Sequence, residues 1–173
     1  MDLVGPLGNP FIVPEENSRV LIVGGGIGVF PLIFLAKQCN ESYRSSLLGF
    51  RNIETSFLID EFKGCSSETG LCSDDGTLGA KGFVTDLLEA ELIQGGWDII
   101  YSCGPEQMLK KVALLAEHYG TRCQVSLEQR MGCGIGACLV CSCKIKAITE
   151  KGWHYARVCK DGPVFWSNEI IWE

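Results

Sequence analysis

Apolar positions in the first 128 residues form short continuous runs that alternate with stretches of helical spacing. Continuous apolar runs are typical of strands buried on both faces of a parallel sheet. The predicted strands are residues 19–23, 46–50, 97–102 and 122–127, with a shorter strand near Leu71. The predicted helices are residues 30–39, 54–62, 83–94 and 106–119. Strands that alternate with helices indicate βαβ units, so the pattern predicts an α/β fold with a doubly wound parallel sheet.

The pattern changes after Glu128. Residues 131–143 are rich in Gly and Cys. Residues 143–148 alternate as a strand of an exposed hairpin would, and residues 154–159 are the predicted partner strand. We therefore predict a boundary near residue 128, between an α/β domain of residues 19–128 and a small domain of residues 129–173. Residues 1–18 contain several Gly and Pro residues and predict an extended lead-in without a core of its own.

Composition narrows the class of protein. The chain has 173 residues, of which 46% are hydrophobic, enough for one ordinary domain and a small appendage. Its formal net charge is -6 and its basic residues are scattered, which argues against nucleic-acid binding. The sequence has no apolar run of about 18 residues and no signal-peptide pattern at its start. These features predict a protein without a membrane span that stays in the reducing cytoplasm.

Cysteines give the most specific chemical signal. Three of the ten cysteines follow the spacing Cys133-x4-Cys138-x2-Cys141, and a fourth, Cys159, follows at a distance. This spacing is typical of plant-type [2Fe-2S] sites. Glycines between the cysteines allow the loop to turn tightly and bring amide N–H groups close to the sulfur atoms. We therefore predict that these four cysteines are the ligands of a [2Fe-2S] cluster.

Two alternatives remain open at this cysteine loop. A structural zinc ion also accepts four cysteines, although usually as two C-x2-4-C pairs. Cys143 competes as a ligand, since a strand would return its side chain to the face of Cys141. The cluster spacing is complete without Cys143, so we leave it out of the ligand set. The other five cysteines are expected to be small buried side chains.

A glycine-rich turn follows the first predicted strand directly. It carries Gly24, Gly26, Gly28 and Pro31, and it opens a helix. Glycines in this position let a phosphate approach the backbone, where the helix N-terminus supplies N–H donors. Proline stands where the dinucleotide pattern G-x-G-x-x-G has its third glycine, and it suits the first turn of a helix. We predict that these residues bind the phosphates of a nucleotide.

A second turn, Cys103-Gly104-Pro105, joins a predicted strand to the next helix. It lies at the carboxyl edge of the sheet, where ligands bind in open α/β folds, although on its own it is better explained as a plain turn from strand to helix. Arg51 ends the second strand, where it would either meet the adenosine end of a nucleotide or extend into solvent.

Together these motifs resemble the ferredoxin–NADP reductase superfamily and, within it, the electron-transfer subunits of dihydroorotate dehydrogenase B. The resemblance is carried by VGGGIGVFPL, LLGFR, SDDGTLGAKGFVTDLL, YSCGPEQMLK, RMGCGIGACLVCSCK and RVCKDGPVF, which span nearly the whole sequence. It implies that the first turn holds the pyrophosphate of NAD and that Cys103, Gly104 and Pro105 face the nicotinamide. No catalytic acid or base is expected in this chain.

The same resemblance implies two further cofactors and a partner. In this family FAD lies between the NAD domain and a preceding β-barrel, and electrons pass through the cluster to an FMN-containing catalytic subunit, in a heterotetramer that serves pyrimidine biosynthesis. Residues 1–18 resemble the end of that barrel, so FAD binding is in doubt here. The related subunits of sulfhydrogenases and ferredoxin–NADP transhydrogenases are one alternative. A truncated, non-catalytic metal-binding fragment is another.

Overall fold

Seven strands form one sheet in the computed structural model, which describes residues 5–39 and 42–172. Residues 1–4 of the predicted lead-in and residue 173 of the predicted second domain lie outside the described residues. The sheet order is β4-β3-β2-β1-β5-β6-β9, and all neighbours are parallel except β6 and β9. The strands are β1 (Arg19–Gly25), β2 (Tyr43–Phe50), β3 (Glu68–Ser73), β4 (Ala80–Lys81), β5 (Ile99–Cys103), β6 (Arg122–Ser126) and β9 (Val164–Trp166).

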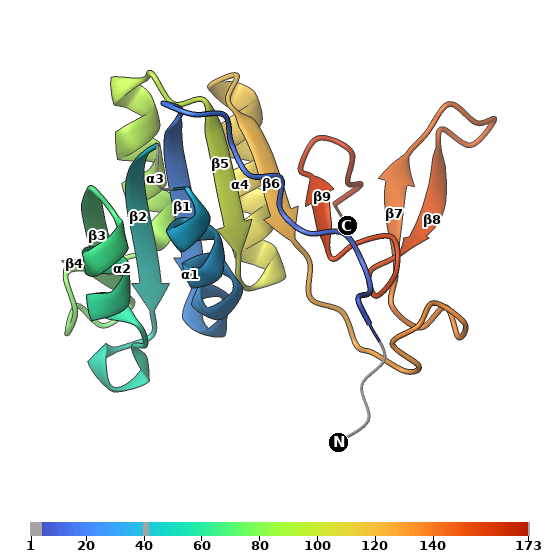
Figure 1. Ribbon diagram of the computed structural model, residues 1–173, viewed down its shortest axis with the longest axis horizontal. Coiled ribbons are helices and arrows are strands. Elements are labelled where there is room, and N and C mark those ends of the chain that lie inside the picture. The colour runs from blue at the N-terminus through green and yellow to red at the C-terminus, as the bar shows by residue number, and fades with distance from the viewer. Residues whose placement is uncertain (1–4, 40–41, 173) are drawn as a thin grey trace.

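Helices cover both faces of this sheet (Figure 1). On one face lie α1 (Val29–Gln38) and α2 (Ile59–Cys65), and on the other lie α3 (Val84–Gln94) and α4 (Glu106–His118). Each face buries its own apolar cluster, because the strands between them are apolar on both sides. The predicted doubly wound α/β fold is confirmed. None of the described helices is long and apolar enough to cross a membrane.

The helix predicted at residues 54–62 is the main error in element placement. Residues Ile53–Thr55 form a short 3-10 turn, η2, which Asn52 caps by accepting a hydrogen bond from the Thr55 amide at 3.0 Å. Leu58 has a φ of 57°, which interrupts a right-handed helix, and α2 therefore begins only at Ile59. Ile59 and Phe62 remain helical, whereas Phe57 and Leu58 lie before the helix, because a local cap and a left-handed residue delay its start by several residues.

The C-terminal segment returns to the sheet. The predicted hairpin forms as β7 (Ser142–Lys146) and β8 (Trp153–Arg157), which pair antiparallel beside the main sheet (Figure 1). Cys159 lies beyond the end of β8, in a turn. The chain then pairs β9 with β6, a strand that the sequence pattern did not predict. The change of character near residue 128 is thus bridged by backbone hydrogen bonds, and the domain division there stays a prediction.

An N-terminal strap, residues 9–12, crosses from the C-terminal segment to the sheet (Figure 1). The Asn9 side chain donates to the carbonyl oxygen of Asp161 at 2.7 Å. Further along, the Ile12 amide donates to Gln124 Oε1 at 2.9 Å, and the buried Tyr101 hydroxyl donates to the Ile12 carbonyl at 2.6 Å. This part of the lead-in is therefore held by specific contacts to the C-terminal segment and to the sheet.

Candidate functional site

The two predicted nucleotide-binding turns touch at the carboxyl edge of the sheet. Gly28 lies so close to the second turn that an added Cβ atom would stand 2.3 Å from the Cys103 carbonyl oxygen and 2.7 Å from the Gly104 nitrogen. Gly25 lies against Pro105 of this second turn and against Met108 of α4, since an added Cβ atom would stand 3.1 Å from Pro105 Cδ and 2.5 Å from Met108 Sδ. Parallel β1 and β5 are adjacent in the sheet, so their following turns meet there. Glycine is needed at position 28 because any side chain would push these turns apart.

A cavity of about 540 Å³ opens beside the first turn. Its volume lies within the range of small-molecule and cofactor sites. Gly26 has a φ of 53° and nothing within 4 Å of an added Cβ position, so its backbone faces open space at the cavity wall. The start of α3, at Val84 and Thr85, forms another part of the wall and adds the positive end of a helix dipole. This edge therefore suits a ligand that carries phosphate.

Several lining residues were not among the sequence predictions. Phe50, Phe83 and Met108 contribute apolar surface, and Gln107 and Lys111 contribute polar groups. They come from β2, from the loop before α3 and from α4, so no local motif could reveal that they share one cavity. Aromatic and thioether side chains suit the flat faces of nucleotide bases.

Charged groups stand at the same cavity. Arg51, which directly follows β2, and Asp74, which directly follows β3, both line it. Lys111 also lines it and pairs with Asp86 at 3.1 Å. Asp86 in turn accepts a hydrogen bond from the Phe83 amide at 3.1 Å, and this amide and Lys111 lower the pKa of the Asp86 carboxyl. Asp86 thus fixes the start of α3 and holds Lys111 near the cavity.

The predicted nucleotide residues have different surroundings. Gly26 and Pro105 line the large cavity. Gly24 instead faces Val29, Leu32 and Leu48, so its role in the structure is close packing of β1 against α1. Pro31 lies exposed in the first turn of α1, as its residue type suggests. The Cys103 thiol is half-buried beside Ser126, and burial raises its pKa.

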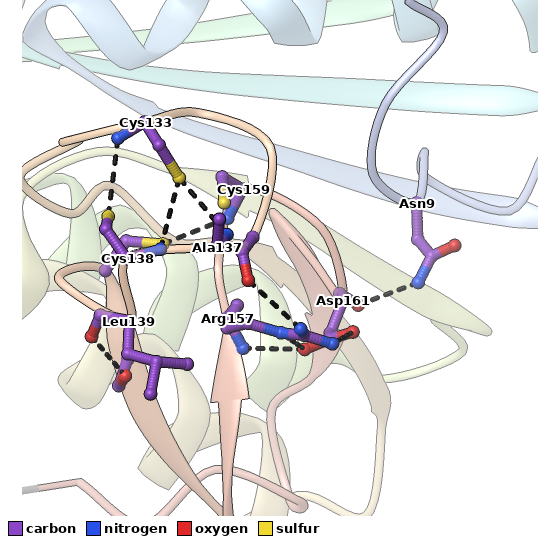
Figure 2. A network of polar contacts seen from close by, with 11 residues as sticks. Asn9, Cys133, Ala137, Cys138, Leu139, Arg157, Cys159 and Asp161 are labelled. Carbon is purple, nitrogen blue, oxygen red and sulfur yellow. Dashed lines mark hydrogen bonds and ion pairs between the residues drawn. The ribbon is translucent and has the colours of Figure 1, made fainter.

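The four predicted ligand cysteines form two pairs. In the first pair, the Cys133 amide donates to Cys138 Sγ at 3.3 Å, and the Cys138 amide donates to Cys133 Sγ at 3.4 Å. In the second pair, the Cys159 amide donates to Cys141 Sγ at 3.5 Å. Figure 2 shows the first pair on the loop and Cys159 opposite it. The fold thereby brings together cysteines that are 18 positions apart.

Backbone amides favour the thiolate form at both pairs. The N–H groups of Ile135, Cys138 and Ala137 lower the pKa of the Cys133 thiol to about 6. The Cys159 amide lowers the pKa of the Cys141 thiol. Thiolates are the form that binds metal, so the loop is prepared to bind cationic iron. Among the described residues, no group of three or more His, Cys, Asp or Glu side chains is arranged to hold a single metal ion.

Two thiolate pairs fit a binuclear cluster. Each iron of a [2Fe-2S] cluster takes two protein thiolates, and the four ligands together are cysteines in this type of site. The donor set is uniformly sulfur, and amide N–H groups already point at Cys133 and Cys141. Such N–H donors around a cluster tune its potential.

Cys143 lies apart from these pairs. It is half-buried against the apolar cluster on the α4 side, and it lines a small cavity of about 140 Å³ with Gly104 and Pro105. Burial raises the pKa of its thiol to about 11. Its surroundings favour the neutral thiol, in contrast to those of Cys133.

The fold and these sites define a class of protein: an α/β nucleotide-binding domain of the ferredoxin reductase type, followed by an iron–sulfur binding segment. One chain of the NADH-dependent reduced ferredoxin–NADP oxidoreductase structure is similar over 99% of this chain and 60% of its own, with a TM-score of 0.83 and 35% identity. The ferredoxin reductase of carbazole 1,9a-dioxygenase shares the fold over 68% of this chain and 39% of its own, with a TM-score of 0.57 and 22% identity.

Sequence comparison is more specific. Residues 128–171 match the iron–sulfur cluster binding domain of dihydroorotate dehydrogenase B. The NAD(+)-type electron-transfer subunit of dihydroorotate dehydrogenase B from Caldanaerobacter subterraneus subsp. tengcongensis is 46% identical over 99% of this chain and 66% of its own length. The same subunit from Geobacillus kaustophilus is 43% identical over 99% of this chain and 65% of its own. The chain belongs to this family of electron-transfer subunits and spans somewhat less than two thirds of the length of these relatives.

Proposed function

We propose that this chain passes electrons between NAD and a partner flavoenzyme, by way of a [2Fe-2S] cluster held by Cys133, Cys138, Cys141 and Cys159. The arrangement of these cysteines as two pairs with amide donors carries the proposal. A cluster of two irons needs two thiolates on each iron, which the two pairs supply. The family membership of the chain supports the same reading.

The large cavity is the proposed site for NAD. The turn at Gly26 and the start of α3 would bind the pyrophosphate through backbone N–H groups. Pro105, together with Cys103 and Gly104, would border the nicotinamide, since this turn touches the phosphate-binding turn. When bound, FAD and the cluster would supply the change between two-electron hydride chemistry and transfer of single electrons.

The proposed partner is an FMN-containing dihydroorotate dehydrogenase catalytic subunit, in a cytoplasmic heterotetramer that acts in pyrimidine biosynthesis. The relatives are named as electron-transfer subunits of that enzyme, which supports this choice. Ile135, Leu139 and Val140 on the cysteine loop are each more than half exposed and offer apolar surface to a partner near the cluster. We expect the chain alone to leave dihydroorotate unchanged.

A second candidate keeps the chemistry but changes the partner. The similarity to a chain of the NADH-dependent reduced ferredoxin–NADP oxidoreductase, at 35% identity over 99% of this chain, favours a subunit of a ferredoxin–NADP transhydrogenase. The two candidates differ in acceptor. The first requires the catalytic subunit and dihydroorotate, and the second requires reduced ferredoxin and NADP.

An anaerobic spectrum tests the core of the proposal. The purified full chain is measured in the visible range before and after dithionite, with iron, zinc and flavin determined on the same sample. A visible absorption that bleaches, with about two irons per chain, is the expected result. One zinc and no iron would refute the redox function and favour a non-catalytic metal-binding fragment. NADH oxidation with a dye acceptor, together with flavin content, then tests whether FAD binds.

A matched pair of variants tests the ligand set. Cys138→Ser removes one thiolate from the first pair and should abolish the visible absorption and most of the iron. Cys143→Ser makes the same atomic change at a thiol that lies outside the pairs, two residues beyond Cys141. This variant should retain both the visible absorption and the iron. Loss of iron in the Cys143 variant alone would show that the ligand set is wrong.

A further inference from the structure

Arg157 ends β8 and is held rigidly by Asp161. Its Nε donates to Asp161 Oδ2 at 2.9 Å and its Nη2 donates to Asp161 Oδ1 at 3.0 Å, which makes a two-bond fork (Figure 2). The backbone amide of Arg157 also donates to Asp161 Oδ2, at 2.8 Å. Such paired bonds fix the plane and direction of the guanidinium group. One nitrogen, Nη1, is thereby aimed in a defined direction.

Nη1 reaches the cysteine loop. It donates to the Gly136 carbonyl oxygen at 3.1 Å, between Cys133 and Cys138 in the sequence. This carbonyl and the Ala137 N–H belong to one planar trans peptide group and point in opposite directions. The Ala137 N–H donates to Cys133 Sγ at 3.2 Å. Arg157 thus holds one end of a peptide dipole while the other end points at a ligand sulfur.

We propose that Arg157 is a positioning residue that acts through the Gly136–Ala137 peptide to raise the reduction potential of the cluster. This inference rests on the proposed function. Reduction adds negative charge, which spreads onto the cysteine sulfurs, and an N–H donor held on Cys133 stabilises that charge. When Arg157 no longer holds the Gly136 carbonyl, the peptide can rotate and the donor is lost from the sulfur.

Arginine is required for this role because of its shape. The guanidinium group binds the Asp161 carboxylate with two nitrogens and still has a third for Gly136. Lysine carries the same charge as a single ammonium group and cannot reproduce this planar arrangement. A change from Arg to Lys therefore separates geometry from charge.

Lys160 provides a matched control. Its side chain passes beneath the same glycine, since an added Cβ atom at Gly136 would stand 2.8 Å from Lys160 Cδ. Lys160→Met removes a positive charge close to the loop and keeps an unbranched side chain there. If only nearby charge matters, this variant should shift the potential as an Arg157 variant does. If the held peptide matters, it should not.

The experiment is a potentiometric titration of the cluster-loaded full chain, followed by visible absorbance and by electron paramagnetic resonance of the reduced state. Arg157→Lys and Arg157→Gln should both lower the potential, with the equilibrium constant for reduction falling about tenfold, or about 59 mV for one electron. Lys160→Met should titrate with the parent. Iron per chain is measured on each sample, so that only loaded protein is compared.

Each outcome decides the proposal. Reduction potentials equal to that of the parent in both Arg157 variants overturn it. The proposal is also overturned if Arg157→Lys keeps the parent potential while Arg157→Gln lowers it, because charge alone then explains the shift. An equal shift in Lys160→Met also overturns it. If Arg157→Gln does not hold iron, Asp161→Asn loosens the fork while keeping the guanidinium, and an unchanged potential there refutes the role. A parent chain loaded with zinc refutes the proposed function itself.

Discussion

Gly28→Ala tests the contact between the two turns most directly. The new methyl carbon would stand 2.3 Å from the Cys103 carbonyl oxygen, whereas ordinary contacts begin at 3.4 Å. Because both partners are backbone atoms, the turns must separate by about 1 Å. Overpacking of this kind costs about 1–3 kcal/mol. For a chain of this size, each kcal/mol lowers the melting temperature by roughly 2–4 °C.

Urea unfolding followed by circular dichroism measures the loss of stability, and fluorescence titration with NADH measures nucleotide binding. We expect the Gly28→Ala chain to unfold at lower urea and to bind NADH more weakly. Gly64→Ala is the control, since Gly64 lies in α2 with nothing within 4 Å of its added Cβ. It should leave stability unchanged or raise it by about 0.5–1 kcal/mol. A Gly28→Ala chain as stable as its parent, with unchanged affinity, would refute the contact between the turns.

Three further predictions concern other parts of the chain. Tyr101→Phe removes the hydroxyl that donates to the N-terminal strap and should lower the free energy of unfolding by about 0.5–1.5 kcal/mol. The control Tyr155→Phe, at an exposed ring, should change the free energy of unfolding by less than about 0.5 kcal/mol, and equal effects of the two variants would contradict the role of the strap. In the metal-free chain, alkylation of Cys133, mapped by mass spectrometry, should reach half of its maximal rate near pH 6, because the pKa of this thiol is lowered to about 6. Cys143, whose thiol pKa is raised to about 11, should react slowly at neutral pH. A Cys133 pH profile like that of an ordinary thiol would contradict the amide contacts. The pKa of the Asp86 carboxyl is lowered in the folded chain, so the carboxylate stabilises the fold fully above the ordinary pKa of 3.8 and loses this effect as pH falls through the lowered pKa. The difference in urea midpoint between the parent and Asp86→Asn should therefore be present near pH 7 and shrink below about pH 4. A difference that stays constant with pH would count against the cap.

The strap and β9 give the cluster segment a fixed place beside the sheet. Asn9 binds the Asp161 carbonyl, and β9 pairs with β6, so two connections far apart in sequence join the same units. One apolar cluster on the α4 side of the sheet includes Leu109 of α4 and continues into the C-terminal segment as far as Val158. This shared packing is a physical reason for the cysteine loop to keep a constant position relative to the cavity.

The sequence alone was sufficient for features that depend on near neighbours. Apolar periodicity reports local structure, and it predicted the α/β fold, although a cap at Asn52 and a left-handed Leu58 displaced one helix. The spacing from Cys133 to Cys141 lies within one loop and can be recognised without a structure. The turn after β1 could be recognised as well, because its glycines directly follow a buried strand.

Tertiary structure decided what depends on contacts between distant segments. The return of β9 to β6 could not be predicted, because three residues carry too little periodicity and pairing depends on the register of the whole sheet. The cavity gathers residues from β2, α3, α4 and the loops between them, which meet only once the parallel strands are aligned. The pairing of Cys141 with Cys159 and the reach of Arg157 to Gly136 arise in the same way. Residue types and spacing therefore determined which chemistry is available, and the packed fold determined which atoms meet to perform it.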